Sequence, residues 1–457
     1  MDSLNIVILA AGKGTRMHSD RPKVLHELAG RSLLRRVLDT AMQFSPAACC
    51  VVYGHGGEVV PNALADSGAR FVLQEPQLGT GHAVQQALAN LSNDEGLTLV
   101  LYGDVPLIQA ATLEAVLQEK DALTLLTIAL ENPYGYGRVL RDEHGKVQRI
   151  VEEKDATPEQ RTRREVNTGI IAAPTRLLRE WVSKLHNHNA QGEYYLTDII
   201  EQAAVQGVNI RTVHPAHAWE VMGVNNKVQL AELERIWQRE QAQALMLQGV
   251  TLADPARIDI RGKLLCGREV EVDVGCVFEG EVSLGNDVHV GAYSIIKDTH
   301  IAAHTRIEAY SHIVEAQIGE NCRIGPYARV RPGSKFGADV HIGNFVEVKN
   351  SDIASNSKAN HLSYIGDCTV GSRVNIGAGT ITCNYDGANK HRTIIEDDVF
   401  VGSDTQLVAP VKIGRGSTIG AGSTITRDTP ENELTLSRSK QAAVPGWKRP
   451  TKQKKVE

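Results

Sequence analysis

Residues 370–381 of this chain read Val-Gly-Ser-Arg-Val-Asn-Ile-Gly-Ala-Gly-Thr-Ile. An aliphatic residue followed by Gly recurs there after six positions, and a small or β-branched residue stands four places after each aliphatic one. The pattern extends from about residue 272 to 425, with clear aliphatic-Gly pairs beginning at Ile324, Ile342, Val370, Ile376, Val401, Ile413 and Ile419. The fourth-place partners include Val346, Val374, Thr380, Thr405, Ser417 and Ser423. A six-residue repeat is typical of a parallel β-helix, so we expect one here.

The interior of such a solenoid is narrow. Aliphatic side chains fill it, while Gly and small residues allow the tight corners between short strands. Large aromatic side chains are not expected to fit, and Phe, Trp and Tyr together make up only 5% of the chain. The repeat is interrupted at Thr382–Thr393, which we expect to form an extruded loop with a functional role.

Residues 1 to about 225 follow a different pattern, in which short, nearly continuous apolar segments alternate with helical periodicity. This alternation predicts an α/β doubly wound, parallel sheet covered by helices. The expected strands are Leu4–Leu9, Cys49–Tyr53, Phe71–Leu73, Leu97–Tyr102 and Leu123–Ala129. The expected helices are Leu33–Met42, Gly81–Leu91 and Ala111–Gln118, and Arg138–Arg141 with Val147–Val151 predicts a hairpin inserted over one end of the sheet.

One helical segment separates the two patterns. Apolar residues recur over residues 228–248 at three- and four-residue spacing, namely Leu230, Leu233, Ile236 and Trp237. We therefore expect a domain over residues 1–227, a linker helix over 228–248, and a β-helix domain with a C-terminal tail over 249–457.

Composition narrows the function classes. The formal net charge of −5 gives no electrostatic reason for a nucleic-acid partner, and no apolar stretch is long enough for a membrane span. The first apolar run lacks a basic segment before it and a cleavage site after it, so a cytoplasmic location is expected. Seven Cys without Cys-x-x-Cys spacing indicate small buried side chains rather than a disulfide framework, with zinc ligation as the alternative.

A glycine-rich stretch, Ala10–Met17, directly follows the first expected strand. A Walker A loop needs Gly at position 7, where Val7 stands, and a dinucleotide fingerprint needs a small residue where Met17 stands. What remains is a turn that presents backbone N–H groups beside Lys13, Arg16 and Lys23, which suits a phosphate chain. A simple tight turn between strand and helix is the alternative.

Further motifs follow in a fixed order. They are Gln74, Leu78–Gly81, Tyr102–Asp104, Gly135–Arg138, Val151–Glu152, Asn167–Gly169 and Gly223–Asn225. With the Gly12 loop, this order resembles nucleotidyltransferases that join a nucleoside triphosphate to a sugar 1-phosphate. Together with His361, Asn384-Tyr385 and Arg438, it resembles the bacterial bifunctional N-acetylglucosamine-1-phosphate uridylyltransferase / glucosamine-1-phosphate acetyltransferase family over almost the whole chain.

The resemblance implies a Rossmann-like nucleotidyltransferase domain, a left-handed β-helix, and a homotrimer whose acetyl site forms between subunits. It implies acetylation of glucosamine 1-phosphate by acetyl-CoA. Transfer of UMP from UTP to the resulting N-acetylglucosamine 1-phosphate then follows, with release of pyrophosphate. The product, UDP-N-acetylglucosamine, serves peptidoglycan and lipopolysaccharide synthesis, hence cell-wall biogenesis and cell shape.

Asp104 is a candidate Mg²⁺ ligand, because it follows a buried strand at the C-terminal edge of the sheet. An ordinary turn with a capping aspartate is the alternative. The resemblance adds Asn225 as a second ligand, and Arg16 and Lys23 as catalytic cations. It places UDP-N-acetylglucosamine against Leu9, Ala10, Ala11, Gly12, Lys23, Gln74, Gly79, Thr80, Tyr102, Gly103, Asp104, Gly137, Glu152, Asn167 and Asn225.

Acetyl transfer to an amine needs a general base, and His is the usual residue. Among sixteen His, His361 stands between Lys349 and Tyr364 where the strict six-residue phase breaks, and the resemblance makes it the base. Glu347 is either its orienting carboxylate or an ordinary outward-facing residue. The resemblance implies substrate contacts at Arg331, Lys349, Tyr364 and Asn375, and acetyl-CoA contacts at Ala378, Asn384, Tyr385, Ser403, Ala421 and Arg438.

Two other functions fit parts of the sequence. One is a single-activity sugar-1-phosphate nucleotidyltransferase whose β-helix is regulatory or trimerising, and the other is a non-catalytic scaffold. A regulatory solenoid needs no general base, so His361, the Asn384 loop and Arg438 favour the bifunctional enzyme.

Overall fold

The computed structural model describes residues 3–91 and 94–452. The chain forms two compact units that divide between Gln241 and Ala242. The extreme ends of the predicted domains, residues 1–2 and 453–457, lie outside the described residues.

The first unit is built on a nine-stranded sheet. Its main order is β11-β7-β10-β6-β1-β4-β5, and the hairpin β8–β9 is attached through β10. The strands are β1 Leu4–Ala10, β4 Ala48–Tyr53, β5 Arg70–Leu73, β6 Leu97–Tyr102, β7 Leu123–Ala129, β8 Arg138–Arg141, β9 Val147–Val151, β10 Glu165–Pro174 and β11 Ile210–Val213, with a separate pair β2 Glu27–Leu28 and β3 Arg31–Ser32. All five strands and the hairpin expected from the sequence are present.

The sheet is mixed, so the prediction of a parallel sheet is corrected. β10 lies between β6 and β7 and runs antiparallel to both. Its residues Ile170 and Ile171 are buried like those of the parallel strands around it. A strand that is buried on both faces has the same apolar sequence in either direction, so its direction could not be read from that pattern.

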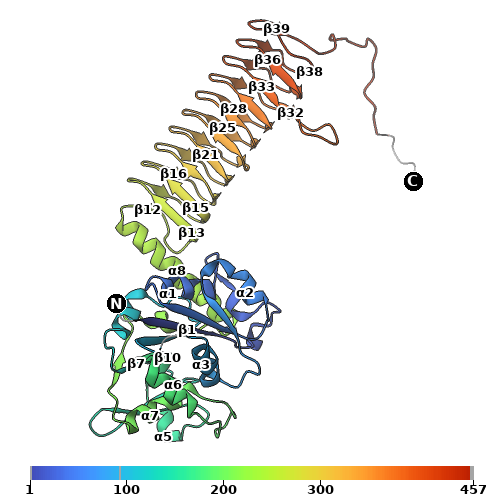
Figure 1. Cartoon of the computed structure of the whole chain (residues 1–457). Coiled ribbons are helices and arrows are strands. Elements are labelled where there is room, and N and C mark those ends of the chain that lie inside the picture. The colour runs from blue at the N-terminus through green and yellow to red at the C-terminus, as the bar shows by residue number, and fades with distance from the viewer. Residues whose placement is uncertain (1–2, 92–93, 453–457) are drawn as a thin grey trace, which may run out of the picture. The chain divides into compact units, whose positions relative to one another are not determined.

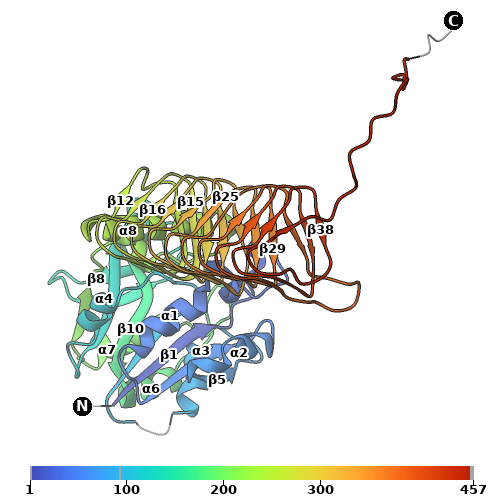
Figure 2. The same ribbon diagram turned by 90° about the horizontal axis from the view of Figure 1, so that it is seen from above.

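Helices cover both faces of this sheet. Figures 1 and 2 show these helices around the sheet. In β1, Ile6 and Ile8 pack on the side of α1, α2 and α4, while Val7 and Leu9 pack on the side of α3, α6 and α7. Burying each such side chain stabilises the fold by about 1.5–3 kcal/mol. The helices are α1 Leu33–Met42, α2 Val59–Ala63, α3 Thr80–Ala89, α4 Ala110–Val116, α5 Pro158–Arg161, α6 Thr175–Ser183 and α7 Ile199–Val205.

Helix α8 spans Lys227–Leu247, and the division between the two units falls within it. In the first unit its Leu233 is fully buried, and the Arg36 guanidinium lies 4.1 Å from the centre of the Trp237 ring. In the second unit Ala242 and Leu245 join the apolar core. The exact domain bounds given above stay a prediction.

The second unit is a parallel β-helix in which successive coils stack on one another (Figure 1). One side consists of β12 Thr251–Leu252, β14 Glu271–Val272, β16 His289–Val290, β19 Arg306–Ile307, β22 Arg323–Ile324, β25 His341–Asn344, β28 Lys358–His361, β31 Asn375–Ile376, β34 Phe400–Val401, β37 Thr418–Ile419 and β39 Leu434–Thr435.

The other two sides share a second ladder. It contains β13 Ile258–Cys266, β15 Cys276–Leu284, β17 Ile295–Lys297, β18 His300–Ile301, β20 His312–Val314, β21 Ala316–Ile318, β23 Arg329–Val330, β24 Ser334–Phe336, β26 Glu347–Lys349, β27 Asp352–Ile353, β29 Tyr364–Gly366, β30 Cys368–Val370, β32 Ile381–Cys383, β33 Thr393–Ile395, β35 Gln406–Val408, β36 Val411–Ile413 and β38 Thr424–Ile425.

The six-residue pattern corresponds to the interior of this β-helix. Ile307, Ile324 and Ile342 are ladder neighbours in consecutive coils, and each is fully buried. The predicted fourth-place partners Val346, Val374, Thr380, Thr405, Ser417 and Ser423 are buried as well. The expectation that large aromatics do not fit was too strict, because Phe278 and Phe336 belong to the core.

Four other aromatics of this unit lie on one outer corner. Tyr293, Tyr310, Tyr327 and Phe345 have φ between 54° and 59°, the left-handed conformation that closes the corner. Their rings stack in sequence with centroids 4.9–5.4 Å apart, and each side chain is about half exposed. We call these four residues the aromatic corner.

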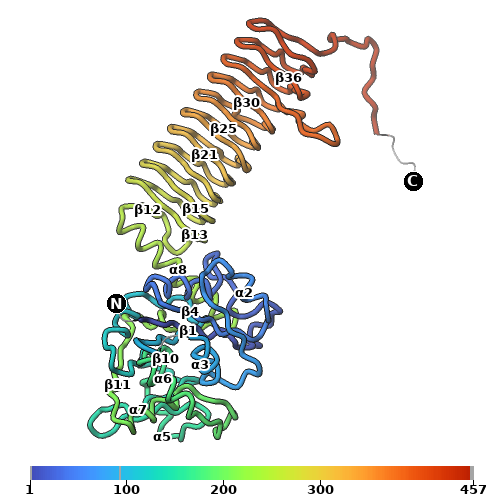
Figure 3. Tube along the Cα trace, viewed as in Figure 1, coloured from blue at the N-terminus to red at the C-terminus, as the bar shows by residue number. Residues whose placement is uncertain are grey.

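The predicted interruption at Thr382–Thr393 contains a loop over residues 384–392, which leaves the coils after β32 and returns at β33 (Figure 3). Its strands remain in register, since Ile381 and Thr382 pair with Gln406 and Leu407 of the next coil. The loop is therefore an insertion that leaves the stacking intact.

All seven cysteines are free thiols, and five of them are buried, which agrees with the sequence-based expectation. Within residues 3–91 and 94–452, no helix combines the length and the apolar character that a membrane crossing requires.

Candidate functional site

The first candidate site begins at the loop after β1. Gly14 has φ 60°, and a Cβ added there would stand 2.7 Å from the Cβ of Lys23. Glycine therefore allows the loop to lie directly against Lys23. The fold places this cation beside the backbone that follows β1, as the phosphate-binding interpretation of the loop requires.

A pocket of about 440 Å³ opens at this edge of the sheet. Residues from the β1 loop, β6 and the start of α3 line it. The predicted binding residues among them are Leu9, Ala10, Ala11, Gly12, Lys23, Gln74, Gly79, Thr80, Tyr102 and Asp104. Gly103, also predicted, lies between Tyr102 and Asp104 in the chain. It packs beside Ala10, because a Cβ added to Gly103 would stand 3.2 Å from the Cβ of Ala10.

Four predicted polar side chains meet beside this pocket. Lys23 forms an ion pair with Asp104, and its Nζ is also 3.5 Å from Oδ1 of Asn225. Arg16 donates a 2.9 Å hydrogen bond to the same Asn225 oxygen. A backbone hydrogen bond from Val224 N–H to Asp104 C=O, 2.9 Å long, holds Asn225 near the end of β6.

The chemistry of these oxygens fits a hard cation. Asp104 and Asn225 offer a carboxylate and a carboxamide oxygen, and the ammonium of Lys23 contacts both. Among the described residues, no group of three or more His, Cys, Asp or Glu could hold a metal by itself. Mg²⁺ commonly binds to one or two protein oxygens and takes its remaining ligands from substrate phosphates and water.

The end of the pocket near α3 is held by Gln74 and Gly79. Gln74 is buried, and its Nε2 donates a 2.9 Å hydrogen bond to the Gly79 carbonyl. Gly79 has φ 104°, and an added Cβ would stand 2.7 Å from the Tyr194 carbonyl oxygen. The hydroxyl of Thr80 accepts a 3.1 Å hydrogen bond from the Leu196 N–H. These bonds fix the start of α3 beside the pocket.

The predicted sugar-binding residues lie around β8, β9 and β10. Asn167 N–H donates to the Gly137 carbonyl at 2.9 Å, and Gly137 lies against Glu152, since an added Cβ would be 3.4 Å from its carboxylate oxygens. Burial raises the pKa of Glu152, and a 2.9 Å hydrogen bond from the Thr197 hydroxyl only partly opposes this. Thr197 is a contact that the sequence motifs did not indicate.

Tyr102 connects the two parts of this site. Burial raises the pKa of its phenol, and the charges of Glu152 and Asp104 raise it further. Gly169 of β10 has φ 90°, and an added Cβ would stand 2.4 Å from the Tyr102 ring. Gly169 therefore leaves space for this ring beside the predicted sugar-binding residues.

The second candidate site lies on the β-helix. Asn344 and His361 are ladder neighbours, and the pairs Ala359–Ile376, Ile376–Val401 and Val401–Ile419 continue the ladder. Ala359, Ile376, Val401 and Ile419 therefore occupy the same place in successive coils. The residues two positions later form one row along the corner, namely His361, Ala378, Ser403 and Ala421. Arg438 closes the row with a 2.7 Å hydrogen bond from Nη1 to the Ala421 carbonyl. The structure thus aligns the predicted base with predicted acetyl-CoA contacts.

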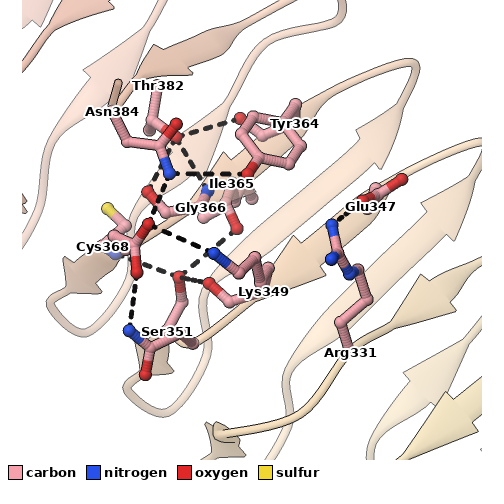
Figure 4. A network of polar contacts seen from close by, with 12 residues as sticks. Arg331, Glu347, Lys349, Ser351, Tyr364, Ile365, Gly366, Cys368, Thr382 and Asn384 are labelled. Atoms are coloured by element: carbon pink, nitrogen blue, oxygen red, sulfur yellow. Dashed lines mark hydrogen bonds and ion pairs between the residues drawn. The ribbon is translucent and has the colours of Figure 1, made fainter. Parts of the chain in front are cut away.

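A polar network lies on the neighbouring side of the β-helix (Figure 4). Lys349, Tyr364 and Asn384 surround it, and Arg331 lies farther along the same side. Lys349 Nζ is 3.6 Å from Oδ2 of Asp367, and Asn384 Nδ2 donates to Asp367 Oδ2 and, at 3.4 Å, to the Tyr364 hydroxyl.

Two other predicted residues occupy separate positions. Asn375 lies half-buried on β31, between Lys358 and Phe400 in its ladder. Tyr385 is 60% exposed in the extruded loop, and its hydroxyl donates a 2.6 Å hydrogen bond to the Gly387 carbonyl. These positions set both residues apart from the network around Asp367.

Within one chain Glu347 pairs with arginines, and its role as the orienting carboxylate of His361 stays a prediction. Its carboxylate accepts a 2.9 Å hydrogen bond from Arg331 and pairs with Arg329 at 3.7 Å. Glu347 and His361 belong to different sides of the β-helix, on β26 and β28. The carboxylate therefore positions Arg331, one of the predicted substrate contacts.

The extruded loop carries a cation that sequence reasoning missed. The neighbouring ammonium of Lys349 lowers the pKa of Lys390. The loop is fixed by a bridge between Tyr385 and Lys390 and by a 2.8 Å bond from His391 N–H to the Asn384 carbonyl. Two neighbouring ammonium groups attract an anion. The signal in the sequence that could have indicated Lys390 was a charged residue within an insertion.

Comparison with known proteins gives matches along the chain. Residues 6–164 match the MobA-like NTP transferase domain, residues 260–346 the GMPPB C-terminal domain, and residues 392–427 the bacterial transferase hexapeptide (six repeats). The chain is 62% identical over 454 residues to "Bifunctional protein GlmU" of Herminiimonas arsenicoxydans, covering 99% of this chain and 100% of that protein.

Two further relatives have the same description. The protein of Nitrosospira multiformis is 62% identical over 458 residues, with 100% of this chain and 99% of the relative covered. The protein of Ralstonia nicotianae is 60% identical over 454 residues, with 99% and 100% covered.

Proposed function

Because this chain belongs to the family of bifunctional GlmU proteins, we propose that its two sites perform two successive transfers. The β-helix acetylates glucosamine 1-phosphate with acetyl-CoA. The N-terminal unit then transfers UMP from UTP to N-acetylglucosamine 1-phosphate and releases pyrophosphate. The observation that carries this proposal is that each unit contains its own cluster of polar side chains, around Asp104 in one and around Asp367, on the side next to the row from His361, in the other.

In uridylyl transfer, a phosphate oxygen of N-acetylglucosamine 1-phosphate attacks the α-phosphorus of UTP. The new P–O bond forms as the bond from the α-phosphorus to the bridging oxygen of pyrophosphate breaks. Negative charge gathers on the phosphates at this point, and cations already held in place stabilise it. Arg16 and Lys23, bonded to Asn225 and Asp104, supply those cations.

We propose Mg²⁺ as the metal ion of uridylyl transfer. Asp104 and Asn225 would hold it, because their oxygens already share a contact with the ammonium of Lys23. A bound Mg²⁺ supplies positive charge to the triphosphate. The pocket residues of the β1 loop, Gln74 and Gly79 orient the nucleotide, and Gly137, Glu152 and Asn167 bind the sugar.

In acetyl transfer, the amine nitrogen of glucosamine 1-phosphate attacks the thioester carbonyl carbon. The C–N bond forms, the C–S bond breaks, and the proton that leaves the amine goes to His361 and then to the departing thiolate. Ala378, Ser403 and Ala421 provide a straight row for the acetyl-CoA arm. Arg331 and Lys349 bind the sugar phosphate, with Lys390 as an added cation.

We also propose a homotrimer in the cytoplasm, where UTP and acetyl-CoA are available. His361, Ser403 and Ala421 are exposed, and the described residues of one chain provide no facing wall for this row. Small-molecule sites enclose most of their ligand, so a neighbouring copy would supply that wall. The aromatic corner supports this arrangement, because it is an exposed apolar surface. Leu362, also exposed, continues this surface after Phe345 and directly follows His361.

One coupled assay tests both activities. Purified protein receives glucosamine 1-phosphate, acetyl-CoA, UTP and Mg²⁺, and UDP-N-acetylglucosamine is measured by chromatography. Product should appear, should stop when acetyl-CoA is omitted, and should return when N-acetylglucosamine 1-phosphate is added. Product that forms only from N-acetylglucosamine 1-phosphate would instead support a single-activity nucleotidyltransferase with a regulatory β-helix.

A further inference from the structure

Asp367 has no role in the chemistry described so far. It occupies the corner between β29 and β30 with φ 49°, and only 7% of it is exposed. Aspartate tolerates this left-handed conformation better than most residues. A carboxylate buried to this degree has to be compensated by hydrogen bonds or opposite charge.

The compensation comes from the corner residues of the coils on either side. Asn350 Nδ2 donates a 2.6 Å hydrogen bond to Oδ1 of Asp367, and Asn384 Nδ2 donates to its Oδ2. The register of the strands brings these three residues into one column, because Lys349 pairs with Gly366 and Tyr364 pairs with Ile381. Asp367 is thus the middle member of an Asn–Asp–Asn column.

The column determines how the Asn384 amide is oriented. An ionised carboxylate can only accept hydrogen bonds, so the NH₂ group of Asn384 must face Asp367. The amide oxygen of Asn384 therefore points away from Asp367. Asn384 also begins the extruded loop, since its carbonyl accepts the His391 N–H, and the same carboxylate holds the start of that loop.

Asp367 also controls the charge of the site. Burial alone would raise its pKa, but the hydrogen bonds from Asn350 and Asn384, together with the positive charge of Lys349, lower it below the ordinary value. The carboxylate is therefore ionised near neutral pH. Lys349 lies 3.6 Å away, and the charge of Asp367 also raises the pKa of Lys390, so one negative charge acts on two neighbouring ammonium groups.

We infer that Asp367 is a positioning residue for acetyl transfer, which orients the Asn384 amide and holds Lys349 for the sugar phosphate. This inference rests on the proposed acetyltransferase function. Asp298, in the same corner column, provides a contrast. It is exposed, and its Oδ1 accepts a hydrogen bond from the backbone N–H of Glu281 at 3.0 Å. A corner carboxylate therefore need not contact side chains of a site.

Asp367→Asn is the decisive single change. Asparagine keeps the size and tolerates the left-handed corner, but it has only one acceptor oxygen, so it cannot accept from the NH₂ groups of both Asn350 and Asn384, and one of these amides has to turn or lose its bond. We expect kcat for acetyl transfer to fall about 10- to 100-fold through misorientation of Asn384. KM for glucosamine 1-phosphate should rise because Lys349 loses the carboxylate that holds it in position. Uridylyl transfer, measured in the same preparation, should be unchanged, and Asp298→Asn is the matched control.

A compensating pair separates positioning from simple stability. In Asn350→Asp/Asp367→Asn, the amide introduced at position 367 can donate to the new carboxylate at position 350 and accept from Asn384, which restores the Asn384 orientation. We expect this variant to regain much of the lost kcat, whereas Asn350→Asp alone should not be active at the wild-type level. The pair also decides the question if Asp367→Asn fails to fold.

The inference is overturned if Asp367→Asn keeps kcat and KM within about 2-fold of the wild type, or if Asp298→Asn loses as much activity. It is also overturned if the paired variant folds, shown by an unchanged circular dichroism spectrum, but recovers no kcat. A wild-type protein that performs no acetyl transfer would refute the proposed function instead.

Discussion

Arg16 donates a 2.9 Å hydrogen bond from Nη2 to Oδ1 of Asn225, although 209 residues of chain separate them. The same oxygen is 3.5 Å from Nζ of Lys23, which pairs with Asp104 at the end of β6. Three distant segments therefore meet at one point. Asp104 and Asn225 therefore reduce the electrostatic repulsion between Arg16 and Lys23 before any phosphate binds.

Asp104→Asn should remove uridylyl transfer and spare acetyl transfer. The change keeps the shape of the side chain but removes the charge that holds Lys23 and a proposed Mg²⁺. We expect kcat for uridylyl transfer to fall at least about 100-fold. Acetyl transfer by the same preparation is the internal control. If both activities fell while the circular dichroism spectrum stayed unchanged, the assignment of one reaction to each unit would be wrong.

His361→Ala should have the opposite effect. Without the general base the amine keeps its proton longer, and acetyl transfer should slow about 100- to 10,000-fold. Release of the CoA thiol, followed with a thiol reagent, measures the step directly. His300→Ala is the matched control, because His300 is an exposed histidine on another coil of the same β-helix. Full acetylation by His361→Ala would exclude the general-base role.

The sequence allowed local features to be predicted well. The six-residue period identifies buried positions such as Ile324 and Ile342, because each coil places the same position inside. Asp104 was predictable as well, since a polar residue directly after a buried strand lies at the edge of the sheet. Both inferences depend only on neighbouring residues.

Relationships between distant segments could not be predicted in this way. His361, Ala378, Ser403 and Ala421 are separated by 17, 25 and 18 residues, so the inserted loop hides their common row. Thr197 donates to Glu152, 45 residues earlier in the chain, without a local pattern to indicate it. Pairing of Glu347 with Arg331 likewise depends on which side of the coil each strand forms.

Glu152 should produce a pH dependence of sugar binding. Burial raises its pKa, so as the pH falls this carboxyl gains its proton at a higher pH than an exposed Glu does. A protonated carboxyl binds sugar hydroxyls less strongly as an acceptor. KM for N-acetylglucosamine 1-phosphate should therefore rise as the pH falls through this raised pKa. In Glu152→Gln this rise of KM should vanish, while the pH dependence that comes from protonation of the substrate phosphate should remain.

The same group makes a stability prediction with a definite sign. A carboxyl whose folded pKa is raised binds more protons in the folded than in the unfolded state, so it destabilises the protein as the pH rises through that interval. Glu152→Gln should therefore raise the Tm of the ligand-free protein at neutral pH. The difference should disappear once the pH falls to the ordinary pKa of Glu. A lower Tm for Glu152→Gln at neutral pH would contradict the burial argument.

Gly169→Ala should impair uridylyl transfer through Tyr102. The added methyl group would stand 2.4 Å from the ring, so the ring must move, and φ 90° is also unfavourable for Ala. Gly145→Ala is a matched control, because Gly145 has φ 78° but its added Cβ meets nothing within 4 Å.

Both glycine variants should lose about 1–2 kcal/mol of unfolding free energy through backbone strain, measured by urea denaturation. Only Gly169→Ala should also raise KM for N-acetylglucosamine 1-phosphate. Equal KM values for the two variants would show that Tyr102 does not shape the sugar-binding part of the pocket.

The aromatic corner should be required for assembly and for acetyl transfer together. An exposed row of stacked aromatic rings on the outside of a solenoid indicates a surface that another protein covers. Tyr310→Glu/Tyr327→Glu places two charges in the middle of this row, where both rings are about half exposed and removing them creates no cavity in the core. Folding should therefore survive, but burial of these charges between copies would be costly.

We expect sedimentation velocity to show smaller species for this double variant than for the wild type. Acetyl transfer should fall in proportion to the lost assembly, because the row from His361 would lose its facing wall, while uridylyl transfer continues. Val205→Glu, at a residue 83% exposed at the end of α7, introduces a charge on an apolar surface position elsewhere and should change neither property. If the corner variant kept the wild-type sedimentation coefficient and acetylated at the wild-type rate, the copies would have to associate through another face of the β-helix.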